Sequence, residues 1–201
     1  GPKTLHLCYC LTPTRYLWSH YDLYFKNNFL KFISKPVINY LKVWDKIAAS
    51  RPDEFIAIST EVKKRIKKYY DRGSKVIFPP VSTPEVAIAN HSRSGYFLVV
   101  SRLVGYKRVD LAVKAFNKLK LPLVVVGTGS QANNLKLIAG NNIKFTGEVS
   151  EEALIKYYQG AKALILPQEE ELGIVSVEAQ SFGVPVIAFK KGGALDSVVE
   201  G

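Results

Sequence analysis

The chain has 201 residues, of which 47% are hydrophobic and 22% charged, and its formal net charge is +11. This balance is that of an ordinary globular protein of one or two small domains and argues against intrinsic disorder. No apolar run approaches the roughly 20 residues of a membrane-spanning helix. The sequence shows no basic leader followed by an apolar core, so nothing in it favours secretion.

Residues 1–90 are expected to form a first domain together with a linker at 82–93. Strands are predicted at 4–11, 55–59 and 75–78, and helices at 18–44, interrupted by Pro36, and at 61–70, capped by Thr60. Cys8 and Cys10 are too close along one strand for an unstrained disulfide. We interpret them as reduced packing residues and expect a cytoplasmic protein.

The positive charge is concentrated in this first part of the chain. Residues 1–90 hold 15 Lys and Arg against 7 Asp and Glu, whereas residues 91–201 hold 13 against 10. The excess favours an anionic partner. The helix at 61–70 has an apolar stripe and otherwise basic faces. This pattern is typical of a solvated surface helix, and it also suits peripheral contact with the inner face of an anionic membrane. No nucleic acid is expected, because base-stacking platforms and recognition helices are missing from the sequence.

In residues 91–201 short apolar runs alternate with amphipathic helical patterns. Strands are predicted at 96–100, 123–126, 143–145, 163–166 and 184–189, and helices at 109–119, 131–138, 151–158 and 173–182. This alternation predicts an α/β fold, a Rossmann-like parallel sheet with helices on both faces. In such sheets ligands bind at the carboxyl ends of the strands, where the candidate loops lie.

The first candidate loop, Ser101–Arg108, follows the strand at 96–100 and carries Arg102 and Lys107. A flexible loop with two cations five residues apart can hold two phosphates, because arginine offers a planar fork of donors and lysine a point charge. The alternative is a solvated basic turn.

The second candidate is an acidic loop that opens a helix at about Gly173, with Glu170 in the loop and Glu178 on the helix. Free amides at a helix start suit an anion, and a glycine allows close approach of a ligand. Carboxylates beside an anion site indicate a ligand with both hydroxyls and phosphate, such as a nucleotide sugar. The alternative is that Glu169–Glu171 simply complement the helix dipole, which leaves Glu178 unexplained.

The third candidate, Gly127-x-Gly129-x-x-Ala132, has the G-x-G-x-x-A form of a dinucleotide-binding turn. It lies in a second strand–helix unit rather than the first, and only Glu148 is placed like a ribose-binding acid. A tight turn beside a ligand is the better interpretation. The three histidines, His6, His20 and His91, lack partners at metal-ligand spacing, so no metal site is predicted.

Together these motifs resemble the retaining glycosyltransferases of family four. The resemblance covers the whole chain and rests on Ser101-Arg102-Leu103, Lys107, Gly127-x-Gly129, Phe145-Thr146-Gly147, Glu170-x7-Glu178-Ala179, Gly183-x-Pro185-Val186 and Gly192-Gly193. It implies the GT-B architecture of two Rossmann-like domains facing across a cleft. The amino-acid sequence of Tyr106–Ala112 is most similar to that of mannosyltransferases of surface-polysaccharide assembly.

The resemblance also implies roles for single residues. Arg102 and Lys107 would bind the donor diphosphate, Glu170 would contact the transferred sugar, and these three would be the catalytic residues. The remaining donor-binding groups would be the ribose contact Glu178, the turn residues Gly127 and Gly129, and the amides of Gly173, Ile174 and Val175. The family is normally metal-independent, so no cofactor is expected, and the cations and the helix start would stabilise the leaving diphosphate.

The family further implies that residues 1–90 are part of an N-terminal, acceptor-side domain and 91–201 a truncated C-terminal nucleotide-sugar-binding domain. We expect a chain cut at both ends that binds a donor such as GDP-mannose without transferring the sugar to a polysaccharide or lipid-linked acceptor. Two departures are Glu171-Leu172 before Gly173 and Leu11 where relatives often place histidine. Two alternatives are an NAD-type dinucleotide domain, which has no use for Glu170 and Glu178, and a non-catalytic nucleotide-sugar-binding module.

Overall fold

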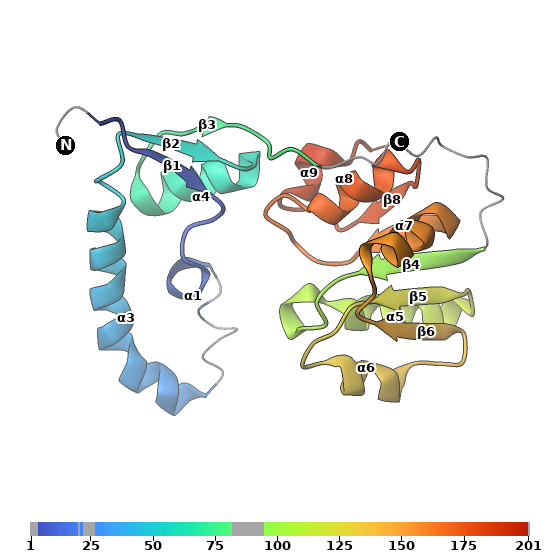
Figure 1. Cartoon of the computed structure of the whole chain (residues 1–201). Helices are drawn as coiled ribbons and strands as arrows, with labels where there is room; N and C mark the ends of the chain where they lie inside the picture. Colours follow the sequence, from blue (N-terminus) through green and yellow to red (C-terminus); the bar gives the residue numbers. More distant parts are fainter. Residues whose placement is uncertain (1–3, 20, 22–26, 82–94, 201) are drawn as a thin grey trace. The chain divides into compact units, whose positions relative to one another are not determined.

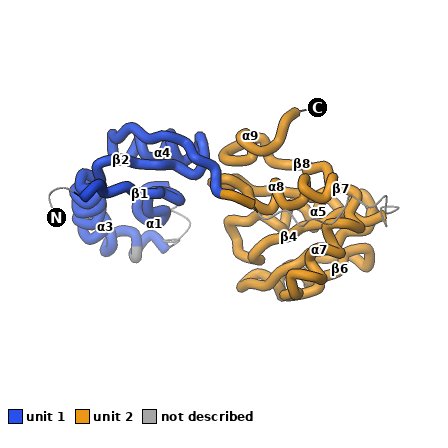
Figure 2. Tube along the Cα trace, turned by 45° about the horizontal axis from the view of Figure 1, so that its top comes forward, with its two compact units in different colours: residues 1–79 blue, residues 80–201 orange. Residues whose placement is uncertain are grey.

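The structure, a computed structural model, describes residues 4–19, 21, 27–81 and 95–200. It divides into two compact units, Gly1–Pro79 and Pro80–Gly201 (Figure 2). The domain boundary predicted at residue 90 and the predicted linker fall within 82–94, outside the described residues, and so do His20 and His91. The position of that boundary therefore stays a prediction.

Unit 1 contains a parallel three-stranded sheet in the order β1-β2-β3. Its described elements are β1 (Leu7–Cys10), α1 (Arg15–Trp18), α3 (Asn28–Ala48), β2 (Glu54–Ala57), α4 (Thr60–Tyr70) and β3 (Lys75–Val76) (Figure 1). Both cysteines are free, as expected. Val62 and Ile66 of α4 are fully buried, so the apolar stripe seen in the sequence packs inside the unit.

Helix α3 corrects the expectation of a break at Pro36, because it runs through the proline without interruption. Proline removes one backbone hydrogen bond, but this helix has 21 residues and Ile38, two residues beyond the proline, is buried. The opposite face of α3 is uncovered. More than half of the surface is exposed for Phe29, Phe32, Ile33, Val37, Tyr40, Val43, Trp44 and Ile47.

The start of α4 corrects a second expectation, since Ser59 caps this helix rather than Thr60. Ser59 is extended, with φ −158° and ψ 166°, and its hydroxyl accepts a hydrogen bond from the amide of Val62 at 3.1 Å. Thr60 is already helical. Two neighbouring hydroxyl residues offer the same capping chemistry, and the extended conformation at Ser59 decides between them.

Unit 2 is built on a five-stranded, fully parallel sheet in the order β6-β5-β4-β7-β8. The strands are β4 (Tyr96–Val100), β5 (Leu123–Val126), β6 (Ile143–Gly147), β7 (Ala161–Leu166) and β8 (Val186–Ala188). The helices are the 3-10 turn η1 (Gly105–Lys107), α5 (Val109–Leu119), α6 (Ala132–Ile138), α7 (Glu151–Gly160), α8 (Ile174–Ser181) and α9 (Ala194–Ser197).

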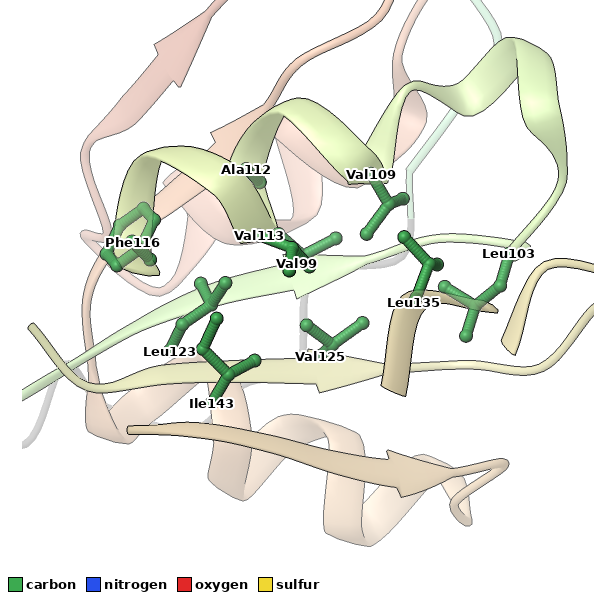
Figure 3. Close-up of a cluster of buried hydrophobic side chains, with 10 residues drawn as sticks. All are labelled: Val99, Leu103, Val109, Ala112, Val113, Phe116, Leu123, Val125, Leu135 and Ile143. Carbon is green, nitrogen blue, oxygen red and sulfur yellow. The ribbon is translucent and has the colours of Figure 1, made fainter. Parts of the chain in front are cut away.

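Helices cover both faces of this sheet, because successive side chains of a strand point to opposite sides. On one face Val99 of β4 packs with Val113 and Phe116 of α5 (Figure 3). On the other face Leu98 packs with Tyr158 of α7 and Ala179 of α8. The predicted α/β fold class is confirmed. Among the described residues, no helix combines the length and the apolarity that crossing a bilayer demands.

Candidate active site

The order of the strands in unit 2 creates a switch point between β4 and β7. From β4 the chain moves to β5 and β6 on one side, and then returns to place β7 and β8 on the other side. The loops after β4 and β7 therefore leave the sheet in opposite directions at one edge. Ligands of open α/β sheets bind in the crevice that such a reversal leaves at the carboxyl ends of the strands.

Lys107 and Glu170 meet at this switch point, although 63 residues separate them in sequence. Lys107 follows β4 and Glu170 follows β7, and the ammonium group donates a hydrogen bond to Oε1 of the carboxylate. The two side chains are only 13% and 15% exposed. An ion pair so far removed from water is screened little, so each charge depends on its partner.

Backbone contacts hold the loop of Glu170 against the loop after β8. Glu170 forms an isolated parallel bridge with Gly192, and its carbonyl accepts a hydrogen bond from the amide of Gly193 at 2.7 Å. Glu169 forms an ion pair with Lys191 at 3.0 Å, whereas Glu171 is buried. The three consecutive carboxylates therefore have three different environments. They also precede the first turn of α8, which begins at Ile174.

The glycines after β5 bring the loops after β4 and β5 into close backbone contact. A Cβ atom on Gly127 would lie 2.1 Å from the carbonyl oxygen of Ser101, and one on Gly129 would lie 2.4 Å from that of Leu103. The amide of Leu103 donates to the carbonyl of Thr128 at 2.8 Å. These glycines thus serve the packing of one loop on another, and their predicted contact with a donor stays a prediction.

Gly173 forms the N-cap of α8 in a left-handed conformation, with φ +77°. The hydroxyl of Ser176 donates to the carbonyl of Gly173 at 2.6 Å, which fixes this first turn. The leading amides, including those of Ile174 and Val175, have no acceptor within a helix because of its geometry. The helix start that the sequence predicts is present at the carboxyl edge of the sheet, where the dipole favours an anion.

Arg102 and Glu178 have contacts of their own, apart from the Lys107–Glu170 pair. Arg102 is exposed, and its Nη2 donates to the hydroxyl of Tyr106 at 2.9 Å. Glu178 accepts a hydrogen bond from the hydroxyl of Tyr158 at 2.7 Å. Burial and this bond to a carboxylate raise the pKa of Tyr158 above its ordinary value, so the phenol remains a neutral donor.

Sequence reasoning missed the partners that orient these charged groups. Gln168 donates from Nε2 to Oε1 of Glu170 at 2.6 Å and is only 2% exposed. Tyr158 stacks on Phe182, with ring centroids 5.5 Å apart. The one available signal for Gln168 was a polar residue two positions beyond the end of an apolar strand. For Tyr158 no local signal exists, because its partner lies 20 residues away.

Comparison with known proteins identifies the family to which the chain belongs. The family model described as glycosyl transferases group 1 matches residues 85–201, which is more than half of the chain and contains all the candidate site residues. The chain belongs to the group 1 glycosyl transferases.

Two curated relatives are similar to this glycosyltransferase at modest identity. An uncharacterized glycosyltransferase of Haemophilus influenzae is 26% identical over 92% of the chain, which spans 52% of that relative. A GDP-mannose-dependent monoacylated alpha-(1-6)-phosphatidylinositol monomannoside mannosyltransferase of Corynebacterium glutamicum is 32% identical over 58% of the chain and 36% of its own length. The chain thus spans about half, or less, of these relatives.

A solved structure supports the fold of the glycosyltransferase. Anabaena Alr3699/HepE in complex with UDP-glucose matches with a TM-score of 0.66 and 22% identity, over 79% of this chain and 51% of that one. At this identity the likeness concerns the fold alone. It agrees with the predicted Rossmann-like α/β fold.

Proposed function

We propose that the chain is the donor-binding part of a retaining glycosyltransferase of family four, with GDP-mannose as its donor. The observation that carries the proposal is the Lys107–Glu170 pair at the switch point between β4 and β7. A cation beside a carboxylate matches a ligand that carries both phosphate and sugar hydroxyls. The GDP-mannose dependence of the Corynebacterium relative supports the choice of base and sugar.

In the proposed complex Lys107 keeps its hydrogen bond to Oε1 of Glu170 and donates a second one to a phosphate oxygen of the donor, since an ammonium group has three donors. The exposed Arg102 binds the same diphosphate, and Glu170 accepts a hydrogen bond from a hydroxyl of the sugar. The amides at Gly173, Ile174 and Val175 complete the anion site, and Glu178 binds the ribose. These donors stabilise the charge that develops on the leaving diphosphate, without need of a metal ion.

The proposal also gives different roles to residues 1–90 and residues 91–201. Residues 91–201 hold the donor, and residues 1–90 belong to the side that meets a polysaccharide or lipid-linked acceptor in the cytoplasm, as in surface-polysaccharide assembly. We expect the chain by itself to bind the donor and to leave the sugar untransferred. Sugar transfer by this chain alone to any acceptor would contradict this part of the proposal.

A thermal-shift panel of GDP-mannose, GDP, UDP-glucose, UDP and NAD tests the proposed donor. GDP-mannose and GDP are expected to raise the melting temperature by several degrees, because a ligand at about 100 times its Kd adds about 2.7 kcal/mol to the unfolding free energy. Glu170→Ala is expected to reduce the shift caused by GDP-mannose to about the shift caused by GDP, because the contacts to the diphosphate remain.

Glu148→Ala is the matched control, since this exposed glutamate lies at the same edge of the sheet and would bind ribose only in a dinucleotide domain. A shift with NAD that Glu148→Ala abolishes would establish that alternative instead. A larger shift with UDP-glucose than with GDP-mannose would keep the glycosyltransferase but refute the choice of base. A non-catalytic module is separated from the proposal by assaying the full-length protein, with Glu170→Ala as its control.

Peripheral contact with an anionic membrane is the last part of the proposal, and unit 1 is the part that would make it. Helix α4 exposes Lys63, Lys64, Lys67 and Lys68, whereas its apolar stripe is buried, so this helix can bind lipid only through charge. The uncovered apolar face of α3 adds side chains suited to the boundary between headgroups and acyl chains.

Sedimentation with phosphatidylcholine vesicles, with and without phosphatidylglycerol, tests this contact. Replacing the four exposed lysines of α4 with glutamine is expected to lower binding to the anionic vesicles by at least about tenfold, since each lysine near the surface contributes about 1 kcal/mol. The control replaces Lys114, Lys118, Lys120 and Lys136 of unit 2. Equal losses in both variants, or binding indifferent to ionic strength, would contradict the assignment.

A further inference from the structure

Gln168 contacts the carboxylate on which the proposed binding of sugar depends. It follows β7 directly after Pro167, and it is almost completely buried. Its Nε2 donates to Oε1 of Glu170, and the ammonium group of Lys107 donates to the same oxygen. Two donors on different loops of the switch point therefore converge on one atom.

This convergence distinguishes the two oxygens of the Glu170 carboxylate. A carboxylate can accept about four hydrogen bonds, two on each oxygen. Lys107 and Gln168 together satisfy Oε1, whereas no side chain in the described part of the protein bonds to Oε2. Because the two donors fix the rotation of the carboxylate, Oε2 is the oxygen left for a ligand.

Burial of the Gln168 amide also costs free energy, and packing alone does not explain why a glutamine stands here. Its Oε1 is buried and has no hydrogen-bond partner among the described residues. An unsatisfied buried acceptor costs about 1 to 3 kcal/mol. Methionine would fill nearly the same volume without that cost, so a role of the side chain as a donor to Glu170 accounts for a glutamine here.

We infer that Gln168 is a positioning residue for the glycosyl donor, holding the carboxylate of Glu170 so that Oε2 accepts a hydrogen bond from a hydroxyl of the transferred sugar. The inference rests on the proposed function and extends it to a residue outside the motif that Glu170 and Glu178 define. It predicts a selective effect. The side chain of Gln168 matters for a ligand that has a sugar beyond the diphosphate and not for the nucleoside diphosphate alone.

Calorimetry of the 201-residue chain with GDP-mannose and with GDP tests this selectivity. Gln168→Met is expected to weaken GDP-mannose binding about tenfold, the equivalent of one well-placed hydrogen bond to a charged group, and to change GDP binding less than about twofold. The control is Gln180→Met, which removes bonds to the carbonyls of Ser176 and Ser197 but does not touch Glu170. It is expected to leave the ratio of the two affinities unchanged.

A purely structural role for Gln168 gives a different result. Gln168→Met would then alter the melting temperature while both ligands weaken equally or not at all, and that outcome overturns the inference. If this variant does not fold, Gln168→Asn, which retains an amide on a shorter side chain, is judged by the same ratio. A chain that prefers UDP-glucose is tested with UDP-glucose and UDP, and an unsubstituted chain that binds neither pair overturns the proposed function as well.

Discussion

Replacing Gly127 with alanine is expected to lower the unfolding free energy of unit 2 by about 3 kcal/mol or more. The added Cβ would lie 2.1 Å from the carbonyl oxygen of Ser101, and φ at this position is +124°, which side chains rarely tolerate. Clash and strain act together here. Relief of the clash requires the loop after β4 to move, so Arg102 and Lys107 would lose their positions as well.

Two further glycines separate these causes. Gly147 also has positive φ, +76°, but a Cβ there meets open space, so Gly147→Ala reports the strain alone, about 1 to 2 kcal/mol. At Gly105 a Cβ meets open space and no positive φ is found, so Gly105→Ala is expected to be nearly neutral. A Gly127→Ala variant no less stable than Gly147→Ala would show that the two loops do not approach as closely as described.

Urea denaturation followed by two signals measures these differences. Both tryptophans, Trp18 and Trp44, lie in unit 1, so their fluorescence follows that unit, whereas far-UV circular dichroism follows both units. The glycine variants of unit 2 are expected to shift the circular dichroism transition. A matching shift in tryptophan fluorescence would indicate that the two units unfold together.

Separating the Lys107–Glu170 pair is expected to have the second largest effect. Lys107→Met leaves a mostly buried carboxylate without its cation, and Glu170→Gln leaves a mostly buried ammonium group without its anion. Each substitution is expected to lower the unfolding free energy by about 2 to 3 kcal/mol, less than for a fully buried pair. The double variant should lose less than the sum, by about 1 to 2 kcal/mol.

The pair Asp110–Lys114 on α5 is the control for this cycle. Its atoms are 3.2 Å apart, but the side chains are 34% and 63% exposed. Such exposed pairs couple by only about 0.3 to 0.5 kcal/mol. If the Lys107–Glu170 cycle gives a coupling no larger than the control, the two charges are held in water rather than in a protected crevice. The proposed donor site would then lose its main support.

The alternation of strands and helices was readable from the sequence because it is a local property. Each strand of unit 2 is a short apolar run, and each helix repeats its apolar positions with the helical period. From this alternation alone the α/β fold class and the parallel sheet follow, since parallel strands need crossover helices that cover both faces. The positions of Lys107 and Glu170 after predicted strands were also readable from the local sequence.

Local patterns were less reliable where two conformations compete. The sequence offered two hydroxyl residues for the cap of α4, and it offered a proline as a break in α3. In the structure Ser59 adopts the extended conformation of a cap, and α3 continues through Pro36. Ser59 and Ile38 are both buried, so packing inside unit 1 favours both outcomes.

The site itself was decided by tertiary structure. The order of the strands, with β4 beside β7, brings Lys107 against Glu170 across 63 residues, and buries Gln168 behind the same carboxylate. It also brings the backbone at Gly127 close to the carbonyl of Ser101. The sequence alone determined which chemical groups follow the strands. Only the folded sheet decided which of them meet, because strand order is set by packing between segments distant in the chain.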